Sequence, residues 1–177
     1  MLARPDLWAR LMDKTTEVVI RYLREQVVAG VEVVQIFDSW VGVLGPGQYR
    51  TSVLPYVTRI FGAIRETGIP TIHFGTGNAS LLDLMRDAGS DIMSLDWRVD
   101  VDAAWERIGY DKGVQGNLDP VLLLAPWETI RDGVRDVLRR AGGRPGHVFN
   151  LGHGVLPDTN PDDLKRIVDL VHEESRR

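Results

Sequence analysis

The sequence predicts an α/β fold built on a parallel sheet, and three observations support this prediction. Short runs rich in β-branched residues alternate with amphipathic helical segments along the whole chain. These runs are almost continuously apolar, which is typical of strands in a sheet that is covered on both faces. Four helical segments are followed by a glycine, at Gly30, Gly68, Gly89 and Gly142. Strands that alternate with helices in this way are expected to be parallel, with right-handed crossovers.

The first helix is predicted over residues 5–29, because its apolar residues recur at three- and four-residue steps before Gly30. The β-branched run VEVVQIF predicts a strand, which opens into Asp38, Ser39 and Trp40 and then into a Gly/Pro loop, VGVLGPG. Further helices are predicted over residues 52–66, 79–88, 101–109, 125–141 and 161–174. Further strands are predicted within IPTIHF, DIMSLDW, GVQGNLD and HVFNLGHG, so that the five strands end near Asp38, Phe74, Asp96, Asn117 and Gly152.

Two architectures fit this order of elements: an open doubly wound sheet, or part of a (β/α)₈ barrel. A closed barrel has eight strands and typically about 250 residues. This chain supplies five predicted strands in 177 residues, so a barrel would lack three of its βα units. No low-complexity segment or linker interrupts the pattern, and we expect residues 1–177 to form a single domain.

Composition excludes several classes of function. The chain contains no Cys, which excludes disulfides and thiolate chemistry, and no close pair of His and carboxylate residues predicts a metal site. The net charge of −4 and the scattered Arg and Lys residues provide no basic surface for nucleic acid. No apolar run reaches the roughly 20 residues of a membrane span, and the first residues lack the apolar stretch of a signal peptide. We expect a cytoplasmic protein with neither a nucleic-acid nor a membrane partner.

Residues that do not look like core packing gather where the predicted strands end. In parallel α/β folds these carboxyl ends meet at one edge, where ligands bind. Ser39 lacks the Gly-x-Ser-x-Gly setting of a hydrolase nucleophile, so it is better suited to donate a hydrogen bond to a bound carboxylate. His153 can do the same, and its flanking glycines would let a ligand approach the main chain. The remaining candidates for the rim of this pocket are Phe37, Asp38, Trp40, Gly75, Asp96, Asn117, Gly152 and Gly154.

Several of these residues also have a structural interpretation. Asp119 precedes Pro120 and is predicted to cap a helix, and Asp96 fits a capping role as well as a binding role. His73 lies within an apolar strand, where a hydrogen-bonded interior histidine is the favoured interpretation. The glycines of GTG, residues 75–77, could approach a phosphate, but the motif lacks the rest of a P-loop or of a dinucleotide fingerprint.

Five stretches in a fixed order carry a family resemblance. QIFDSWVGVLGP, HFGTG, LDWRV, QGNLDP and FNLGHGVLPDTNP resemble the C-terminal portion of uroporphyrinogen decarboxylase, and the leading helix resembles the segment that precedes the first stretch. The resemblance covers essentially the whole chain. It implies the C-terminal five βα units of a (β/α)₈ TIM barrel, and therefore an incomplete barrel. Ser39 and His153 match the serine and the histidine that contact substrate in the family.

What the resemblance implies is a cytoplasmic homodimer that needs no cofactor. It decarboxylates the four acetate side chains of uroporphyrinogen III to give coproporphyrinogen III in haem biosynthesis, so its ligand is an anionic tetrapyrrole. The family's essential aspartate, its carboxylate-binding arginines and a substrate-contacting tyrosine lie in the N-terminal part of the barrel. No residue of this chain matches them, so we expect no catalytic residue here and no activity without the N-terminal part.

Two other hypotheses remain. The related corrinoid and coenzyme M methyltransferases share the barrel and bind zinc through a His-x-Cys pattern. The matching positions here are His73, Phe74 and Gly75, and glycine cannot replace the thiolate. Alternatively, the chain is a non-catalytic half-barrel that pairs with a copy of itself or with a separately encoded N-terminal half. Unpaired strand edges and exposed apolar surface would then cause self-association.

Overall fold

The computed structural model describes residues 1–175, and it contains one sheet of five parallel strands. The strands are β1 (Val34–Asp38), β2 (Thr71–Gly75), β3 (Ile92–Ser94), β4 (Gly113–Gln115) and β5 (His147–Val148). Each strand pairs with the next one along the chain, so the spatial order equals the sequence order. A doubly wound sheet reverses its strand order, and this sheet does not. The predicted α/β fold is confirmed, and its winding is that of part of a barrel.

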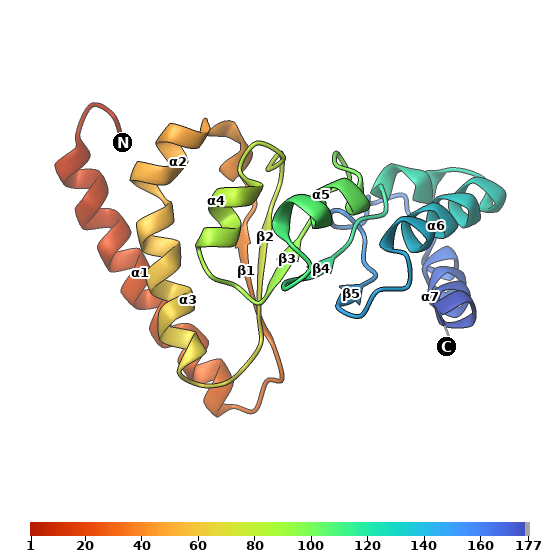
Figure 1. The fold of residues 1–177 in the computed structure, drawn as a ribbon, viewed down its shortest axis with the longest axis horizontal. Helices are drawn as coiled ribbons and strands as arrows, with labels where there is room; N and C mark the ends of the chain where they lie inside the picture. Colours follow the sequence, from red (N-terminus) through yellow and green to blue (C-terminus); the bar gives the residue numbers. More distant parts are fainter. Residues whose placement is uncertain (176–177) are drawn as a thin grey trace.

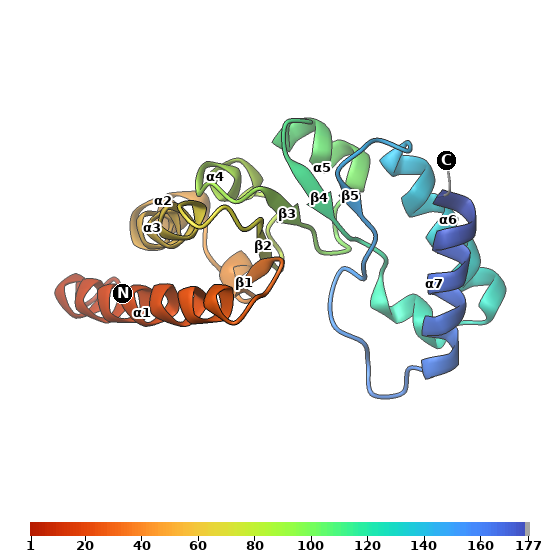
Figure 2. The ribbon, with the colours of Figure 1, turned by 90° about the horizontal axis from the view of Figure 1, so that it is seen from below.

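The helices lie along the outer side of this sheet. Figure 2 shows the strands in a curved row, with α1 and α7 at its two ends and the other helices between them. Figure 1 shows the same order along the length of the molecule. The α-helices are α1 (Pro5–Val28), α2 (Pro46–Ser52), α3 (Leu54–Arg65), α4 (Leu82–Asp87), α5 (Val101–Ile108), α6 (Trp127–Ala141) and α7 (Pro161–Ser175). Two short 3₁₀ helices, η1 (Val41–Val43) and η2 (Pro120–Leu124), follow β1 and β4.

Proline accounts for two differences from the predicted boundaries. The helix predicted over residues 52–66 is divided, because α2 ends at Ser52 and α3 starts at Leu54 with Pro55 in its first turn. The predicted Gly/Pro loop contains η1 and the start of α2 at Pro46. The helix predicted from residue 125 starts at Trp127, because the residue before Pro126 is extended. Its predicted end is confirmed, since Gly142 takes the left-handed conformation at a φ of 65°.

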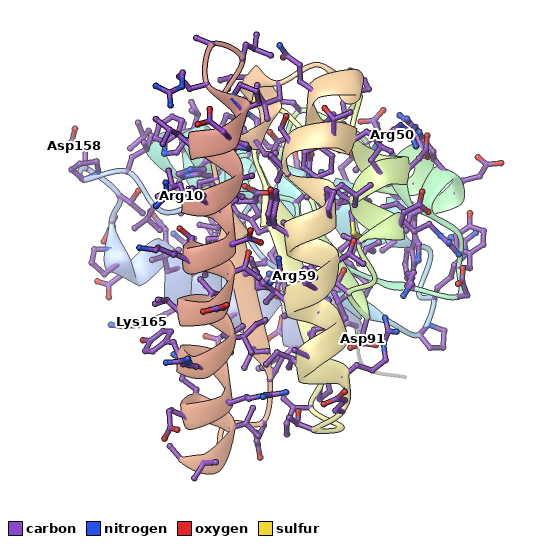
Figure 3. The ribbon with its side chains drawn as sticks, turned by 90° about the vertical axis from the view of Figure 1, so that its left-hand side faces the viewer. Arg10, Arg50, Arg59, Asp91, Asp158 and Lys165 are labelled. Atoms are coloured by element: carbon purple, nitrogen blue, oxygen red, sulfur yellow. The ribbon has the colours of Figure 1, made fainter. Side chains whose placement is uncertain are left out.

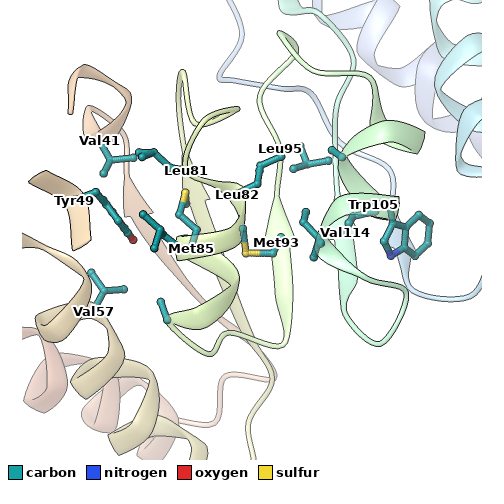
Figure 4. Packing of buried hydrophobic residues seen from close by; sticks show 14 of the residues in the cluster. Val41, Tyr49, Val57, Leu81, Leu82, Met85, Met93, Leu95, Trp105 and Val114 are labelled. Atoms are coloured by element: carbon teal, nitrogen blue, oxygen red, sulfur yellow. The ribbon is translucent and has the colours of Figure 1, made fainter. Parts of the chain in front are cut away.

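The core lies between the outer face of the sheet and the helices. Figure 4 shows its largest cluster, in which Met93 and Val114 of the strands meet Tyr49, Met85 and Trp105 of the helices. All five of these side chains are almost completely buried. A second cluster joins α6 to α7, and a third joins α1 and α3 to β1. The rigid, helix-covered outer face leaves the inner face of the sheet free to carry a site.

Helices α1 and α3 lie side by side at one end of the sheet (Figure 3). The indole N–H of Trp8 donates to the carbonyl of Ser52 at 2.8 Å, and Arg59 pairs with Asp13 at 2.5 Å. One stripe of α1 is exposed and apolar, and it consists of Leu7, Leu11, Val18 and Tyr22. Of the helices within residues 1–175, none has both the length and the apolar character that crossing a bilayer requires.

Candidate functional site

A cavity of about 510 Å³ lies on the inner face of the sheet, opposite the helices. Side chains from β1, β2 and β3 line one side of it, and the segment that follows β5 lines the other. The ten lining residues are Gln35, Phe37, Ser39, Phe74, Ser94, Asn150, Leu151, His153, Gly154 and Val155. The first strand of the sheet and the segment that follows the last strand therefore contribute to one site.

The alternation of side chains along β1 explains why Ser39 reaches this cavity. Successive residues of a strand point to opposite faces, so Gln35, Phe37 and Ser39 share one face. Ile36 and Asp38 point the other way, and Ile36 packs into the core beneath the helices. The carbonyl of Ser39 accepts a hydrogen bond from the hydroxyl of Thr76, in the loop after β2. Ser39 is thus held by its main chain, and its side chain faces the cavity.

Packing, rather than a strand, places His153. The chain leaves β5 at Val148 and pairs once more at Leu151, through a single bridge to Leu118. A Cβ added to Gly152 would lie 2.9 Å from the Cβ of Trp97, so only glycine fits against that neighbour. The His153 ring then meets Trp97 and Phe74 edge to face, each at 6.1 Å between ring centroids.

Four of the ten residues predicted from the sequence line the cavity: Phe37, Ser39, His153 and Gly154. The other six predicted residues lie outside the lining: Asp38, Trp40, Gly75, Asp96, Asn117 and Gly152. A Cβ on Gly154 would meet no atom within 4 Å, so the chain is open on that side of His153. The two glycines beside His153 therefore differ, because Gly152 contacts protein and Gly154 borders the cavity.

Asp96 and Asn117 hold the loops that surround the cavity. Asp96 is completely buried, and its carboxylate accepts hydrogen bonds from the main-chain N–H of Gly77 at 2.6 Å and of Arg98 at 3.1 Å. The Arg98 guanidinium pairs with the same carboxylate at 2.6 Å and stacks on the Trp97 ring. The Asn117 amide donates to the carbonyls of Asp96 and Val99. The capping interpretation of Asp119 is confirmed, since its carboxylate accepts from the N–H of Val121.

Three other predicted residues have positions that packing explains. A Cβ on Gly75 would come within 2.8 Å of the Val41 side chain, so this glycine allows the loop after β1 to close over β2. Trp40 is 82% exposed beside the cavity. Asp38 faces the helix side of the sheet, where its carboxylate lies 3.7 Å from His73.

Six lining residues were not predicted from the sequence. Gln35 could have been found, because it precedes Phe37 by two residues on the same face of a strand. Phe74 and Ser94 follow the same alternation on β2 and β3. Asn150, Leu151 and Val155 carry no such signal, since they lie beyond the end of β5 and their position depends on packing against distant loops.

The cavity lining combines apolar side chains with polar ones, and it contains no Lys or Arg. Its polar side chains are those of Gln35, Ser39, Ser94, Asn150 and His153. The guanidinium of Arg98 is half exposed near the His153 end, but it is already paired with Asp96. The described part of the site can therefore donate hydrogen bonds to an anion, while most of the compensating charge would have to come from other residues.

His73 does not contribute to this cavity. It is completely buried on the helix side of β2, with its ring 5.1 Å from that of Phe61 in α3. The prediction of an interior position is confirmed. The expected hydrogen bond is not closed in this structure, because neither ring nitrogen has a partner among the described residues and the nearest carboxylate oxygen, that of Asp38, lies 3.7 Å from Nε2. Within residues 1–175 no group of three His, Asp or Glu side chains could hold a metal ion. The histidine that would match the methyltransferase zinc ligand points away from the cavity.

Comparison with known proteins gives the same relationship for the whole chain. The family model described as uroporphyrinogen decarboxylase (URO-D) matches residues 1–174. The chain belongs to the uroporphyrinogen decarboxylase family. It is 51% identical over 176 residues to the uroporphyrinogen decarboxylase of Sorangium cellulosum, and 49% identical over 175 residues to that of Carboxydothermus hydrogenoformans. The protein of that name from Streptomyces avermitilis is 49% identical over 177 residues.

These matches cover at least 99% of this chain but 50% of each relative, so the chain spans about half the length of the uroporphyrinogen decarboxylases it matches. The resemblance stated from the five sequence stretches is confirmed. The half-length coverage agrees with a sheet of five strands, since a (β/α)₈ barrel has eight. In the terms of this family, the described cavity is one side of a barrel mouth.

Proposed function

We propose that this chain forms the C-terminal side of the substrate cavity of a uroporphyrinogen decarboxylase. Ser39 and His153, the two residues that match substrate contacts in the family, line one cavity from opposite ends of the sheet. This is the observation that supports the proposal most strongly. In it, the Ser39 hydroxyl and a His153 ring N–H donate hydrogen bonds to carboxylates of an anionic tetrapyrrole, and Phe37 and Phe74 contact its apolar surface.

The chemistry of the substrate explains why such a cavity needs no cofactor in this proposal. Protonation of a pyrrole carbon beside an acetate group makes a cationic ring, which accepts the electrons released when CO₂ leaves. The electrons that CO₂ leaves behind neutralise the ring as an exocyclic methylene. A proton added to this methylene makes the methyl group, and the ring carbon then loses the proton that it gained first, so that the ring is again a neutral pyrrole. The protein must hold the carboxylates and stabilise the transient positive charge, which is a task for preorganised electrostatics. We propose that the aspartate and the arginines of the family perform that task, and that this chain has no activity without them.

Binding and turnover test this proposal separately. Uroporphyrin, the stable oxidised form of the substrate, serves as the probe in a fluorescence titration of the purified chain. We expect Ser39→Ala and His153→Ala each to weaken binding by about tenfold, as the loss of a hydrogen bond to a charged group should. Ser80→Ala and His172→Ala are matched controls, because these two side chains are exposed and outside the cavity lining.

Two outcomes would contradict the proposal. Unchanged uroporphyrin binding in both cavity variants would show that Ser39 and His153 do not contact the tetrapyrrole. Ordinary conversion of uroporphyrinogen by the 177-residue chain would show that the aspartate and arginines of the family are not required.

We also propose that the chain self-associates, as a homodimer in the family's manner. Two apolar side chains in the segment after β1 support this, because Trp40 and Val43 are 82% and 81% exposed. Exposed apolar surface of this kind usually marks an interface. Sedimentation by analytical ultracentrifugation should show a dimer that Trp40→Ser weakens, and a monomer at all concentrations would refute self-association.

The cytoplasm is the compartment that the family resemblance suggests, and cell fractionation would test it.

A further inference from the structure

Three polar groups are buried together on the outer face of the sheet, away from the cavity. His73 of β2 is completely buried, and both of its ring nitrogens lack a hydrogen-bond partner among the described residues. The Asp38 Oδ2 atom of β1 and the Tyr49 hydroxyl of α2 are also buried, and neither has a hydrogen-bond partner within residues 1–175. Buried polar atoms are almost always paired in native proteins. Three such residues in one place therefore require an explanation.

Two of these groups, those of His73 and Asp38, lie close enough to act on one another. The Nε2 atom of His73 lies 3.7 Å from Asp38 Oδ2, just beyond hydrogen-bond distance. In the register of the two strands, His73 pairs with Ile36 and Gly75 pairs with Asp38, so both side chains point to the same face. The pKa of Tyr49 is raised, first by burial and then by the negative charge of Asp38. A small rotation or one water molecule would let the imidazole N–H donate to Asp38.

The residue after Asp38 is Ser39, which faces the cavity. The main-chain carbonyl of Ser39 itself accepts the hydrogen bond from the Thr76 hydroxyl. Gly42, three residues further on, lies against the loop after β2, since a Cβ there would come within 2.7 Å of the Gly77 Cα. Strand β2 and its loop thus contact the main chain before, at and after Ser39.

We propose that His73 is a positioning residue for Ser39, acting through a hydrogen bond to the carboxylate of Asp38. With Asp38 held on the helix side, the alternation of the strand directs the next side chain into the cavity. His73 itself contacts no part of the cavity, so its effect on a ligand is indirect. The consequence for binding rests on the proposed function of Ser39, whereas the effect on the main chain does not.

Hydrogen exchange measured by mass spectrometry tests the positioning role on the 177-residue chain without any ligand. Removal of the donor in His73→Phe should accelerate amide exchange in residues 39–43 by roughly tenfold or more, because the segment opens locally more often. His73→Gln keeps an N–H donor and should restore slow exchange. His147→Phe is the matched control, since it removes a partly buried histidine from β5 that contacts Gly116 instead. It should leave residues 39–43 unchanged.

If His73→Phe does not fold, a second variant that changes Asp38, the other partner in the contact, keeps the test decisive. Asp38→Ala removes the acceptor and should accelerate exchange in the same residues. Slow exchange in residues 39–43 of a folded His73→Phe or Asp38→Ala chain would overturn the positioning role, and so would fast exchange in His73→Gln.

Uroporphyrin titrations of the same variants separate this inference from the proposed function. We expect His73→Phe to bind uroporphyrin about as weakly as Ser39→Ala does, and His73→Gln to bind it normally. If Ser39→Ala binds normally while His73→Phe accelerates exchange, the proposed contact of Ser39 with substrate is wrong and the positioning role stands. If Ser39→Ala weakens binding and His73→Phe changes neither measurement, the positioning role is wrong and the proposed function stands.

Discussion

Ser39 and His153 reach the same cavity from supports of different kinds. Ser39 follows β1, a strand of five residues in which every residue from Val34 to Asp38 has a partner on β2. His153 follows β5, which has two residues, and only one further bridge precedes it. Hydrogen bonds along a ladder therefore direct the serine, whereas a packing contact between Gly152 and Trp97 directs the histidine.

This difference shows where each end of the cavity is vulnerable. A ladder distributes its main-chain hydrogen bonds over several residues, so the direction of β1 itself does not depend on one side chain, and the proposed contact of His73 with Asp38 acts on the segment that follows the strand. A close approach of main chains depends on one missing Cβ, and a single methyl group would break it. We expect the His153 end to be the more sensitive of the two to small substitutions.

The largest effect should come from Gly152→Ala, which tests the packing support directly. The new Cβ would overlap the Trp97 main chain and side chain, and neither can move freely because Asp96 beside it is buried. We expect a loss of about 3 kcal/mol in the free energy of unfolding, as overpacking against main chain costs. Urea unfolding followed by Trp fluorescence would measure this loss.

Gly154→Ala is the matched control for that substitution. A Cβ at Gly154 meets open space, so its cost should be below about 0.5 kcal/mol. Equal stability losses in the two variants would show that the contact with Trp97 does not position this segment.

The substitution Asp96→Asn should have the next largest effect, and it should disturb the loops at both ends of the cavity. The Asp96 carboxylate accepts from Gly77, in the loop that contacts Ser39, and it precedes Trp97, on which Gly152 rests. Loss of its charge weakens a buried, charge-assisted set of hydrogen bonds, and we expect a cost of roughly 2 kcal/mol. Chemical-shift changes at both Ser39 and His153 in NMR spectra would show the coupling.

Asp83→Asn is a suitable control, because Asp83 makes a similar two-bond contact with Arg107 on the surface. Both partners are largely exposed, so the cost should stay below about 1 kcal/mol. If Asp96→Asn costs no more than Asp83→Asn, burial of the carboxylate does not matter for the loops.

The same contrast explains which parts of the structure the sequence could predict. Apolar runs that alternate with helical segments, and glycines that end helices, are signals between neighbours in the chain. The five strands and most helices were therefore predicted within a few residues. Phe37 and Ser39 were both predicted for the rim of the pocket, and the alternation along β1 explains why both face it. The extent of β5 depends on pairing with β4, a long-range interaction, and the predicted strand over residues 147–154 was accordingly too long.

Contacts between loops explain the candidates that do not line the cavity. The partners of Asp96 and Asn117 come from loops after other strands, and no local pattern identifies them. Gly152 and Gly154 look alike in the sequence Gly-His-Gly, yet one is packed and the other is open. The role of His73 could not be predicted from the sequence for the same reason, because its buried ring nitrogens can be recognised only once β1 and α2 are placed beside it.

A smaller effect is expected from Asp119→Ala, which tests the support of β4 rather than that of β5. The Asp119 carboxylate accepts from the N–H of Val121 at 2.9 Å and caps η2, just after the bridge that holds Leu151. Loss of a helix cap costs about 1 kcal/mol. Urea unfolding should show that loss, and an unchanged midpoint would mean that solvent replaces the cap at no cost.

The smallest effect should be the pH dependence that His147 gives to β5. Burial lowers the pKa of His147, and this outweighs the opposite effect of its hydrogen bond to the Gly116 carbonyl. The unfolded chain, with an ordinary histidine pKa of about 6.5, therefore binds this proton more readily than the folded chain. The stability that His147 contributes is fully present above its pKa in the unfolded chain. It is lost as the pH falls from that value toward the lower pKa of His147 in the folded chain.

Urea unfolding at pH 7.5 and at pH 5.5 would measure this contribution by difference. Carboxylates also titrate at the lower pH, so the drop in stability is compared with that of His147→Gln, which retains a polar side chain without a proton to gain. We expect the wild-type chain to lose more stability than His147→Gln over this interval. Equal losses would mean that the folded chain protonates His147 as readily as the unfolded chain does, and that burial at the start of β5 is too slight to support the segment that carries His153.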